Sequence, residues 1–430
     1  MSRRNAIIIT SLVLLTLFTV NCRENAQKII FQSRQHLKLA PPESVGMSSE
    51  RLARIDKVIN QYIENKWLPG AVALIARHGK IVYYKNFGTR DFQTKETLQK
   101  DDIFRIASMS KGITVVAVMM LYEEGKFLLD DPISKYIPEF KNPKILLKVN
   151  KKDSTYTSKP SKNEITIRNL LTHTSGIGYA FQNPKLSIIY QKAGVPGGFV
   201  RSYDTLANKM KTLGKLPLLH EPGERWTYGL SHDVLGYFVE VISGMSFDEF
   251  LQERIFKPLG MNDTYFYLTE EKKERLVPVF LDIEDGKLKE YHRRWYTYPI
   301  KGKTYFSGGG GLSSTTLDYA KFIQMLLNNG EYNNVRLLSR KTVELIRTNQ
   351  IGDLWGDSEF GLGFGITSNS DKSQKLSSVG NYWWGGYFGT SFWIDPEEDL
   401  IGVLMKQVYS DKHEDLNEKF EILTYQAIVN

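Results

Sequence analysis

The stretch Ser108-Met109-Ser110-Lys111 carries the most information about this chain, because nowhere else in the sequence does Lys follow Ser by three positions. It lies after a short segment, 102–107, and before a long apolar run from Ile113 to Leu121. This run predicts a buried helix that ends near Gly125. Residues three apart share one face of a helix, so we expect the Ser108 hydroxyl and the Lys111 amine to lie together. A serine beside an amine at a helix N-terminus can become a nucleophile without a histidine.

Strand patterns occur on both sides of this helix in the sequence. Before it, a helix is expected over 48–67, and strands over 71–76 and 81–87 flank a turn that contains Gly79. After it, strands are expected over 361–366, 379–383, 390–395 and 400–406, followed by a helix from about Asp415. We therefore expect an α/β (α+β) fold. Both ends of the chain build one antiparallel sheet flanked by helices, and a mainly helical subdomain at approximately 125–300 is inserted.

The composition is that of a folded domain with a basic surface. The 430 residues are 41% hydrophobic and 24% charged, with a formal net charge of +8. No nucleic-acid-binding motif accompanies this charge, and the Lys-rich segment 141–162 is expected to be an exposed loop. Nucleic acid is therefore not an expected partner.

The N-terminus has the pattern of a targeting segment. Arg3 and Arg4 precede a 15-residue apolar segment, 6–20, which is shorter than the roughly 20 residues of a spanning helix. The lone cysteine, Cys22, follows, and the arrangement resembles a bacterial lipoprotein signal. It predicts a signal peptide over 1–21, lipidation at Cys22, a tether over 22–44 and a hydrolase domain over 45–430. The protein would then be exported to the bacterial cell envelope and held at a membrane by lipid. An ordinary cleaved signal and an uncleaved anchor remain the alternatives.

Two further motifs accompany the Ser-x-x-Lys stretch. Tyr228 lies 228 − 108 = 120 residues after Ser108, and Trp384-Gly385-Gly386 begins 156 residues after Tyr228. Other matching phrases are Leu129-Asp130-Asp131-Pro132, Leu171-Thr172-His173-Thr174-Ser175-Gly176, Gly308-Gly309-Gly310-Gly311 and Trp393-Ile394-Asp395-Pro396. On these motifs, the chain from about 42 to 407 resembles the serine β-lactamase and penicillin-binding-protein superfamily. It is most similar to the class C β-lactamase-like branch that includes the family VIII carboxylesterases. The resemblance implies a DD-peptidase-like fold, in agreement with the expected sheet.

The resemblance also implies a role for each motif residue, without a cofactor. Ser108 would attack a carbonyl and become acylated, while a desolvated, neutral Lys111 would accept its proton. Tyr228 would share the proton relay. The backbone N–H groups of Ser108 and Tyr387 would form the oxyanion hole. Trp384, Gly385 and Gly386 would bind the substrate along a strand edge.

Two positions depart from the pattern of the superfamily. Leu230 stands where β-lactamases and DD-peptidases usually have Asn, and Trp384 stands where they have Lys or His. A carboxylate-bearing substrate would lose its polar partner at Trp384, so small-molecule esters are the favoured substrates. The expected activity is that of a carboxylesterase. A β-lactamase or D-amino-acid (DD-) peptidase with amide substrates, and a non-catalytic envelope binding protein, remain as alternatives.

Several other features suggest weaker interpretations. We expect a structural, hydrogen-bonding role for His173 and a close-packed turn at 308–311. The loops 177–198 and 281–305 are expected to shape the mouth of the cleft, whereas Lys406 has no assigned role. The sequence contains no Gly-x-Ser-x-Gly, and its seven His and single Cys have no metal-binding spacing, so neither an α/β-hydrolase nor a metal site is expected.

Overall fold

The computed structural model describes residues 36–92, 94–196, 204–283, 287–291, 299–300, 304–371, 374–409 and 413–430. The expected signal peptide, Cys22 and the first part of the expected tether lie outside these residues. None of the helices in the described ranges combines the length and the apolar character that crossing a bilayer requires.

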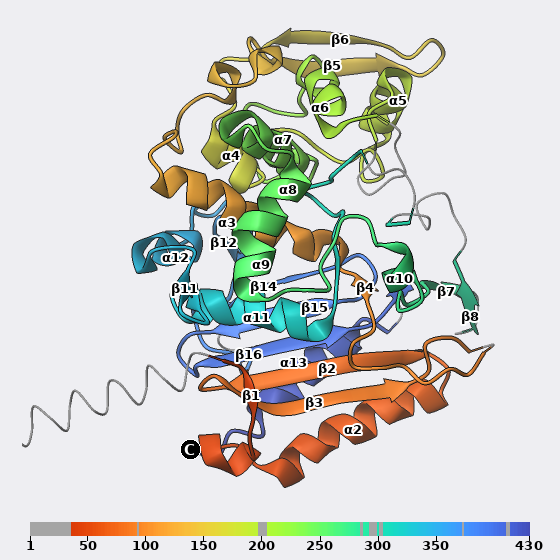
Figure 1. Ribbon diagram of the computed structural model, residues 1–430. Coiled ribbons are helices and arrows are strands. Elements are labelled where there is room, and N and C mark those ends of the chain that lie inside the picture. The colour runs from red at the N-terminus through yellow and green to blue at the C-terminus, as the bar shows by residue number, and fades with distance from the viewer. Residues whose placement is uncertain are drawn as a thin grey trace, which may run out of the picture.

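An eight-stranded sheet forms the centre of the molecule (Figure 1). Its strand order is β1-β3-β2-β16-β15-β14-β13-β12. The bounds are β1 Lys38–Leu39, β2 Gly70–Arg77, β3 Lys80–Gly88, β12 Glu359–Phe360, β13 Gly365–Ile366, β14 Tyr382–Gly385, β15 Ser391–Asp395 and β16 Leu400–Met405. The two ends of the chain meet where β2 pairs with β16, with Ala73 opposite Leu404. The mixed fold with a sheet built from both termini is therefore confirmed.

The register of the sheet is antiparallel except at one edge. There β1 pairs with β3 in parallel. This strand and the 3-10 turn η1 (Pro42–Val45) lie within the segment that we expected to be a tether. Backbone pairing of Lys38 and Leu39 with β3 gives this edge of the sheet a short covering strand.

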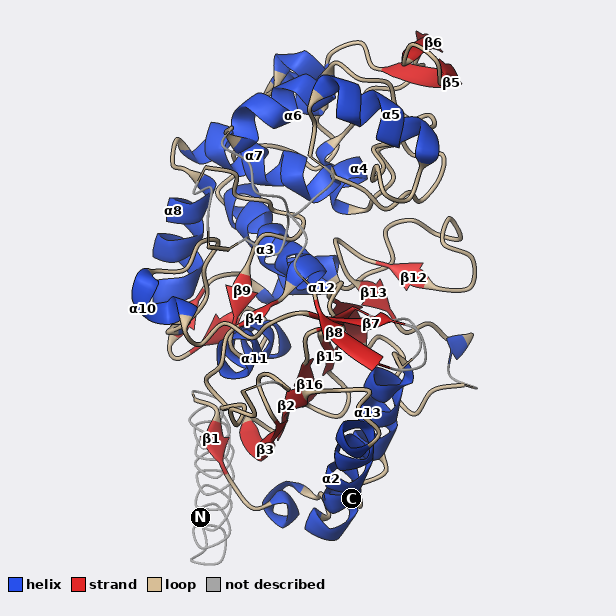
Figure 2. Cartoon of the chain, turned by 90° about the vertical axis from the view of Figure 1, so that its right-hand side faces the viewer, coloured by secondary structure: helices blue, strands red, loops and turns tan. Residues whose placement is uncertain are grey.

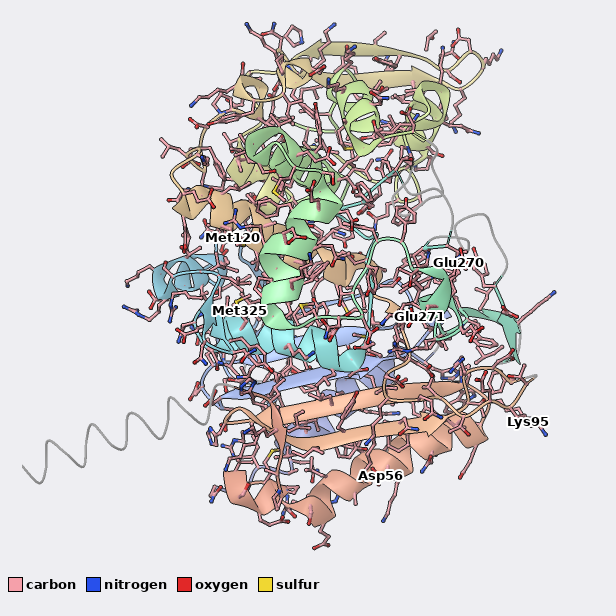
Figure 3. All side chains as sticks on the ribbon, in the orientation of Figure 1. Asp56, Lys95, Met120, Glu270, Glu271 and Met325 are labelled. Carbon is pink, nitrogen blue, oxygen red and sulfur yellow. The ribbon has the colours of Figure 1, made fainter. Side chains whose placement is uncertain are left out.

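Two helices from opposite ends of the sequence cover one face of the sheet. They are α2 (Ser49–Glu64) and α13 (Asp415–Tyr425). The Ser48 side chain caps α2 by accepting a hydrogen bond from the Arg51 N–H. On the sheet-facing side of α2, Asp56 accepts hydrogen bonds from the Tyr83 hydroxyl and the Lys85 amine, both at 2.6 Å (Figure 3). These bonds fix α2 against β3.

The other face of the sheet packs against α11 (Thr316–Leu327) and α3 (Ser110–Glu123). Residues 110–121 of α3 are all buried, because the helix lies between the sheet side and the helical part of the molecule. This position explains why its sequence is apolar all round rather than on one stripe. It also holds the N-terminus of α3 at a fixed place inside the molecule.

The remaining helices lie mostly within the expected insertion; α4 to α7 form the upper part of the molecule, while α9, α10 and α12 lie lower, toward the sheet (Figures 1 and 2). They are α4 Ile167–Leu171, α5 Pro184–Ala193, α6 Leu206–Gly214, α7 Ser231–Ser243, α8 Phe247–Leu251, the π-helix η5 Gln252–Phe256, α9 Lys257–Leu259, α10 Glu270–Lys273 and, outside it, α12 Arg340–Ile346. Short 3-10 turns are η2 Ala107–Met109, η3 Ile133–Lys135 and η4 Pro138–Phe140. The small sheets pair β4 Phe104–Arg105 with β9 Ser313–Ser314, β10 Glu331–Tyr332 with β11 Val335–Arg336, and β17 Val408–Tyr409 with β7 Phe280–Ile283 and β8 Lys287–Glu290.

The Lys-rich segment 141–162 is not the loop that its composition predicts. It forms a β-hairpin from β5 (Lys144–Asn150) and β6 (Thr155–Pro160). Ile145 and Leu146 are buried, and the Leu146 N–H donates to the Leu218 carbonyl at 2.8 Å. Two buried apolar residues and this backbone anchor stabilise a hairpin whose other side chains face water.

The predicted strand over 361–366 is mostly a turn in the structure, since residues 361–364 connect β12 to β13 and only Gly365–Ile366 is a strand. The short strands β12 and β13 flank a turn in which the Gly361 N–H donates to the Phe364 carbonyl at 2.8 Å. Gly363 has φ +79, a conformation that reverses the chain and that other residues rarely adopt. The apolar run therefore continues through a tight turn.

Candidate active site

Ser108 lies in η2, the 3-10 turn that leads directly into α3. The Lys111 Nζ lies 3.2 Å from the Ser108 Oγ, as the spacing of the two residues predicts. Lys111 is almost fully buried, with 1% of its surface exposed. Ala107, the residue before the serine, has φ +43. A non-glycine residue rarely adopts this conformation, so the turn that presents Ser108 is held by its surroundings.

The Lys111 amine has two other partners. It lies 3.2 Å from the Tyr179 hydroxyl and 2.6 Å from the Gly309 carbonyl oxygen. An ammonium has three N–H groups for these three contacts, whereas a neutral amine has two N–H groups and one lone pair. Since Gly309 can only accept, a neutral amine would direct its lone pair at one of the two hydroxyls. The geometry thus suits the transfer of a hydroxyl proton to Lys111.

The turn 308–311 is close-packed, as expected, and it is also part of this cluster. The Thr114 hydroxyl on α3 donates to the Gly308 carbonyl at 2.7 Å and so fixes the turn next to Lys111. Behind it lies the buried Asp233 of α7, which accepts a hydrogen bond from Ser307 at 2.6 Å. Burial raises the pKa of the Asp233 carboxyl, while hydrogen bonds and the nearby Lys111 charge oppose the shift. Sequence reasoning did not find Tyr179 or Asp233 as neighbours of Lys111.

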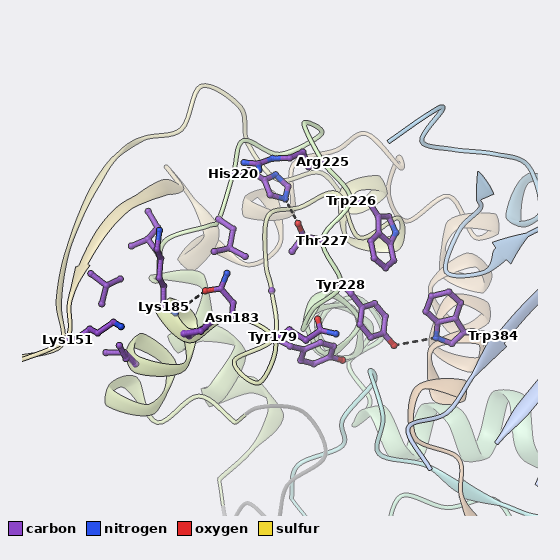
Figure 4. Close-up of a pocket in the computed structure, with 17 residues that line it drawn as sticks. Lys151, Tyr179, Asn183, Lys185, His220, Arg225, Trp226, Thr227, Tyr228 and Trp384 are labelled. Carbon is purple, nitrogen blue, oxygen red and sulfur yellow. Dashed lines mark hydrogen bonds between the residues drawn. The ribbon is translucent and has the colours of Figure 1, made fainter. Parts of the chain in front are cut away.

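Tyr228 belongs to the cluster, but its relation to Lys111 differs from the expected relay. The Lys111 Nζ lies over the face of the Tyr228 ring, 4.5 Å from the centroid. The Tyr228 hydroxyl accepts a hydrogen bond from the indole Nε1 of Trp384 at 3.4 Å (Figure 4). The phenol that is hydrogen-bonded to the amine is Tyr179, and burial raises the pKa of Tyr179 well above its usual value of 10. Tyr179 is therefore a neutral phenol at ordinary pH.

Two buried histidines support this region from behind. The His173 ring contacts the rings of Tyr228 and His232, with centroids 4.7 and 4.6 Å away. Burial lowers the pKa of both histidines well below 6.5, so their imidazoles are neutral. The carbonyl of His173 accepts a hydrogen bond from the Thr227 N–H at 2.7 Å. The structural role expected for His173 thus uses its backbone and ring face, since its ring nitrogens have no hydrogen-bond partner among the described residues.

The Trp384-Gly385-Gly386 motif ends β14 next to the turn that presents Ser108. A Cβ atom placed on Gly386 would lie 2.5 Å from the Ile106 carbonyl oxygen and 2.1 Å from the Thr390 Oγ1. Only a glycine permits this close approach of the two backbones. Tyr387 is the next residue after Gly386, and Ser108 is two residues after Ile106. The close approach of Gly386 to Ile106 therefore brings together the two segments whose N–H groups are expected to form the oxyanion hole.

A cavity of about 960 Å³ opens beside this cluster (Figure 4). Tyr179, Tyr228 and Trp384 line one part of it. Other residues of the segment 177–198 line another part; this segment was expected to be a loop at the cleft mouth, but its residues Pro184–Ala193 form the helix α5. Other aromatic rings continue the wall, since Trp226 is stacked with Tyr228 and with Trp355. Much of the other expected mouth loop, 281–305, lies outside the described residues, and none of its described residues lines this cavity. Within the described ranges, no group of three or more His, Cys, Asp and Glu is placed to hold a metal ion.

The comparison with known proteins agrees with this architecture. The family model described as Beta-lactamase matches residues 55–425. This chain belongs to the β-lactamase family. Protein Rv1367c of Mycobacterium tuberculosis is 34% identical over 350 residues, which cover 78% of this chain and 84% of that protein. Esterase EstB of Burkholderia gladioli is 29% identical over 382 residues, covering 85% and 92%. The solved structure of EstCE1, described as a hydrolase with promiscuous acyltransferase activity, has a TM-score of 0.77 at 25% identity and covers 87% of this chain and 99% of that one.

Membership of the β-lactamase family makes the chain a serine hydrolase of the β-lactamase and penicillin-binding-protein fold. Within this β-lactamase-family site, the two unusual positions have different surroundings. Leu230 is fully buried at the start of α7, whereas Trp384 is half-buried and reaches the cavity. Lys406, to which sequence reasoning gave no role, is buried beside Gly389, and burial lowers its pKa to about 8.

Proposed function

We propose that this protein is a carboxylesterase that forms an acyl-enzyme on Ser108. The observation that carries the proposal is the 3.2 Å contact between the Ser108 Oγ and the buried Lys111 Nζ, beside a cavity with aromatic walls. A serine hydroxyl in contact with an amine acceptor needs no other general base.

The reaction would proceed in two halves. In the first, the Ser108 proton moves to Lys111 as the oxygen attacks the ester carbonyl, and the backbone N–H groups of Ser108 and Tyr387 stabilise the oxyanion. Collapse of the tetrahedral intermediate breaks the bond to the alcohol oxygen, which takes up a proton relayed through Lys111 and Tyr228. In the second half, water gives a proton to the same pair, attacks the acyl-Ser108 carbonyl and releases the acid, so that Ser108 regains its hydrogen.

An ester substrate is supported by the walls of the site. Trp384 replaces the cation that would hold a carboxylate next to the scissile bond, and the neighbouring rings of Tyr228 and Trp226 are also apolar. The similarity to EstB and to EstCE1, an esterase and a hydrolase by their names, supports the same choice.

Hydrolysis of p-nitrophenyl butyrate by the purified protein tests the proposal, together with mass spectrometry of the protein after incubation with that ester. The expected result is turnover and one acyl adduct on the peptide that contains Ser108. Ser108→Ala should abolish both. Turnover that survives this substitution would assign the chemistry to another residue. If a fluorophosphonate probe does not label the folded wild-type protein, the non-catalytic binding role is favoured.

A β-lactamase or DD-peptidase is the second candidate, because the Ser108–Lys111 contact suits amide substrates as well. Nitrocefin and a fluorescent penicillin separate the two activities. Rapid nitrocefin turnover with negligible ester hydrolysis would reverse the preference for esters.

A further inference from the structure

The cavity beside Tyr228 is larger than a short-chain ester needs. Its volume of about 960 Å³ lies at the upper end of the range that holds drug-sized molecules. An acetate or butyrate ester would occupy only the part next to Tyr228 and Trp384. The rest of the cavity therefore indicates a longer substrate, part of which lies away from the scissile bond.

Among the described residues, the charged side chains on the walls of this cavity are all of one sign. They are Lys151, Lys185 and Arg225, and no described Asp or Glu lines the cavity. Figure 4 shows Lys151 and Lys185 at the end of the cavity away from Trp384, with Arg225 on the rim between the ends. The lining also contains His220. Its imidazole is neutral, because burial lowers its pKa.

Carboxylates near these cations in the sequence are engaged elsewhere. Asp153 accepts hydrogen bonds from the N–H and the hydroxyl of Thr155. Glu221 accepts from the Ser161 hydroxyl and the Lys162 N–H. Among the described residues, Glu224 is the carboxylate that approaches a cation of the cavity; it lies 3.7 Å from the Arg225 Nε, and both side chains are more than half exposed. Solvent screens such a pair strongly, so the cationic character of the cavity is retained.

The position of Lys185 adds a second, independent observation. It lies in the first turn of the ten-residue helix α5, where no acidic residue is present. The N-terminus of a helix carries partial positive charge, so a lysine there is electrostatically unfavourable unless an anion lies nearby. An anionic ligand in the cavity would relieve this repulsion.

Apolar side chains also line the cavity, namely those of Leu146, Val149, Ile188 and Leu219. The cavity thus has an aromatic end at the proposed chemistry, two lysines at the far end and further apolar side chains on its walls.

We propose that the natural substrate is an amphipathic ester with an anionic group, a carboxylate or a phosphate, separated from the scissile carbonyl by an apolar spacer. This inference rests on the proposed function and adds the substrate class. It differs from carboxylate recognition next to the scissile bond, because Trp384 occupies that position and Lys151 and Lys185 lie at the opposite end of the cavity.

The test compares p-nitrophenyl octanoate with its analogues of the same chain length that end in a carboxylate or a phosphate. At low ionic strength, kcat/KM for an anionic ester should exceed that for the neutral ester by about 10-fold, and 0.5 M NaCl should reduce the ratio. The stronger of the two anionic esters identifies the head group. The triple variant Lys151→Gln/Lys185→Gln/Arg225→Gln should bring the ratio close to one. Lys341→Gln, an exposed lysine on α12, is the matched control and should keep the wild-type ratio.

An equal kcat/KM for neutral and anionic esters would overturn the inference, as would a preference that the triple variant retains. A binding measurement separates failure of this inference from failure of the proposed esterase function. Calorimetric binding of the methyl half-ester of octanedioic acid, compared with methyl octanoate, to the Ser108→Ala protein measures the same preference without turnover. Selective binding without turnover in the wild type would count against the esterase and not against the anion site.

Discussion

The indole Nε1 of Trp384 donates a hydrogen bond to the hydroxyl oxygen of Tyr228 at 3.4 Å. Sequence reasoning treated Trp384 as an apolar wall in place of a polar residue. The structure gives it a second role, because its donor orients the hydroxyl that the proposed mechanism uses. Trp384 thus stands where related enzymes have Lys or His, and it also positions the Tyr228 hydroxyl.

Trp384→Phe keeps an aromatic wall and removes the donor. Loss of one neutral hydrogen bond is worth about 1 kcal/mol, so kcat/KM for p-nitrophenyl butyrate should fall about 2- to 10-fold. Trp383→Phe is the matched control, since the Trp383 Nε1 has no hydrogen-bond partner in the described structure. Equal effects of the two substitutions on kcat/KM would mean that the bond to Tyr228 has no part in the reaction.

The two tyrosines near Lys111 should differ in their contributions. Tyr228 lies half-buried between Trp384 and the amine, whereas Tyr179 is buried and shares Lys111 with Ser108 and Gly309. Removal of a proton-transfer group costs about 100-fold or more in kcat, and we expect that loss for Tyr228→Phe. Tyr179→Phe leaves two of the three contacts of the amine, so its loss should be less than 10-fold. Steady-state kinetics with one ester decide the order, and the reverse order would move the relay to Tyr179.

Gly386→Ala tests the close approach between β14 and the turn before Ser108. The added Cβ would meet the Ile106 carbonyl at 2.5 Å, so the two backbones must separate. Displacement of an oxyanion donor costs about 100- to 1000-fold in kcat. Gly385→Ala is the control, because its Cβ would meet only the Thr390 carbonyl, at 3.3 Å. If both variants keep wild-type kcat, the oxyanion hole does not involve Tyr387.

The buried pair His173 and His232 should make the fold sensitive to acid. Their pKa values are held well below 6.5 in the folded protein by burial, whereas the unfolded chain takes up protons near pH 6.5. Stability contributed by the neutral rings is complete above pH 6.5 and is lost as the pH falls below it, by about 1.4 kcal/mol per pH unit for each histidine. Asp248 acts in the opposite direction, because burial raises its pKa to about 6.

Urea unfolding between pH 5 and 7.5 measures this dependence. His232→Gln should reduce the loss of the free energy of unfolding by about 1.4 kcal/mol per pH unit below pH 6.5. The assignment fails if the slope for His232→Gln equals that of the wild type.

The proposed lipid anchor is testable with one substitution. Cys22→Ser removes the thiol that a lipid would modify, so the protein should move from the membrane fraction to the soluble fraction of the envelope. Mass spectrometry of the wild-type N-terminus should show a lipidated Cys22. An unmodified N-terminus, or an unchanged distribution of the variant, would contradict lipidation.

The main features of the fold could be predicted because local patterns and long-range structure agree. The expected hairpin, 71–76 and 81–87, appears as β2 and β3, since two strand-like apolar runs flank a Gly-containing turn. The helix expected over 48–67 is α2, which ends at Glu64. The hairpin of β5 and β6 was not predicted, because its many charged side chains are typical of a loop. It is held by the hydrogen bond between the Leu146 N–H and the Leu218 carbonyl, two residues that sequence spacing does not relate.

In the candidate site, too, local sequence predicts some contacts, whereas contacts between distant segments could not be predicted. Ser108 and Lys111 could be paired from their spacing, because the turn η2 that holds Ser108 runs directly into α3, which holds Lys111. Tyr179 reaches Lys111 from a loop 179 − 111 = 68 residues away, and Asp233 approaches from α7. Contacts between side chains from separate elements depend on packing and leave no periodicity in the sequence. The phrase at 171–176, which matches the superfamily, is the nearest signal that could have directed attention to Tyr179.

The pairing of β2 with β16 means that the central sheet cannot be completed until late in synthesis of the chain. Ala73 lies opposite Leu404, so 404 − 73 = 331 residues separate the two central strands of the sheet. The first hairpin can form early in synthesis, yet one of its edges stays open until nearly the whole polypeptide has emerged from the ribosome. A chain that ends before residue 400 would lack β16. The strand β2, whose residues are all buried in the whole protein, would then have an unpaired edge open to other chains. We expect such a chain to aggregate rather than to form a smaller stable unit.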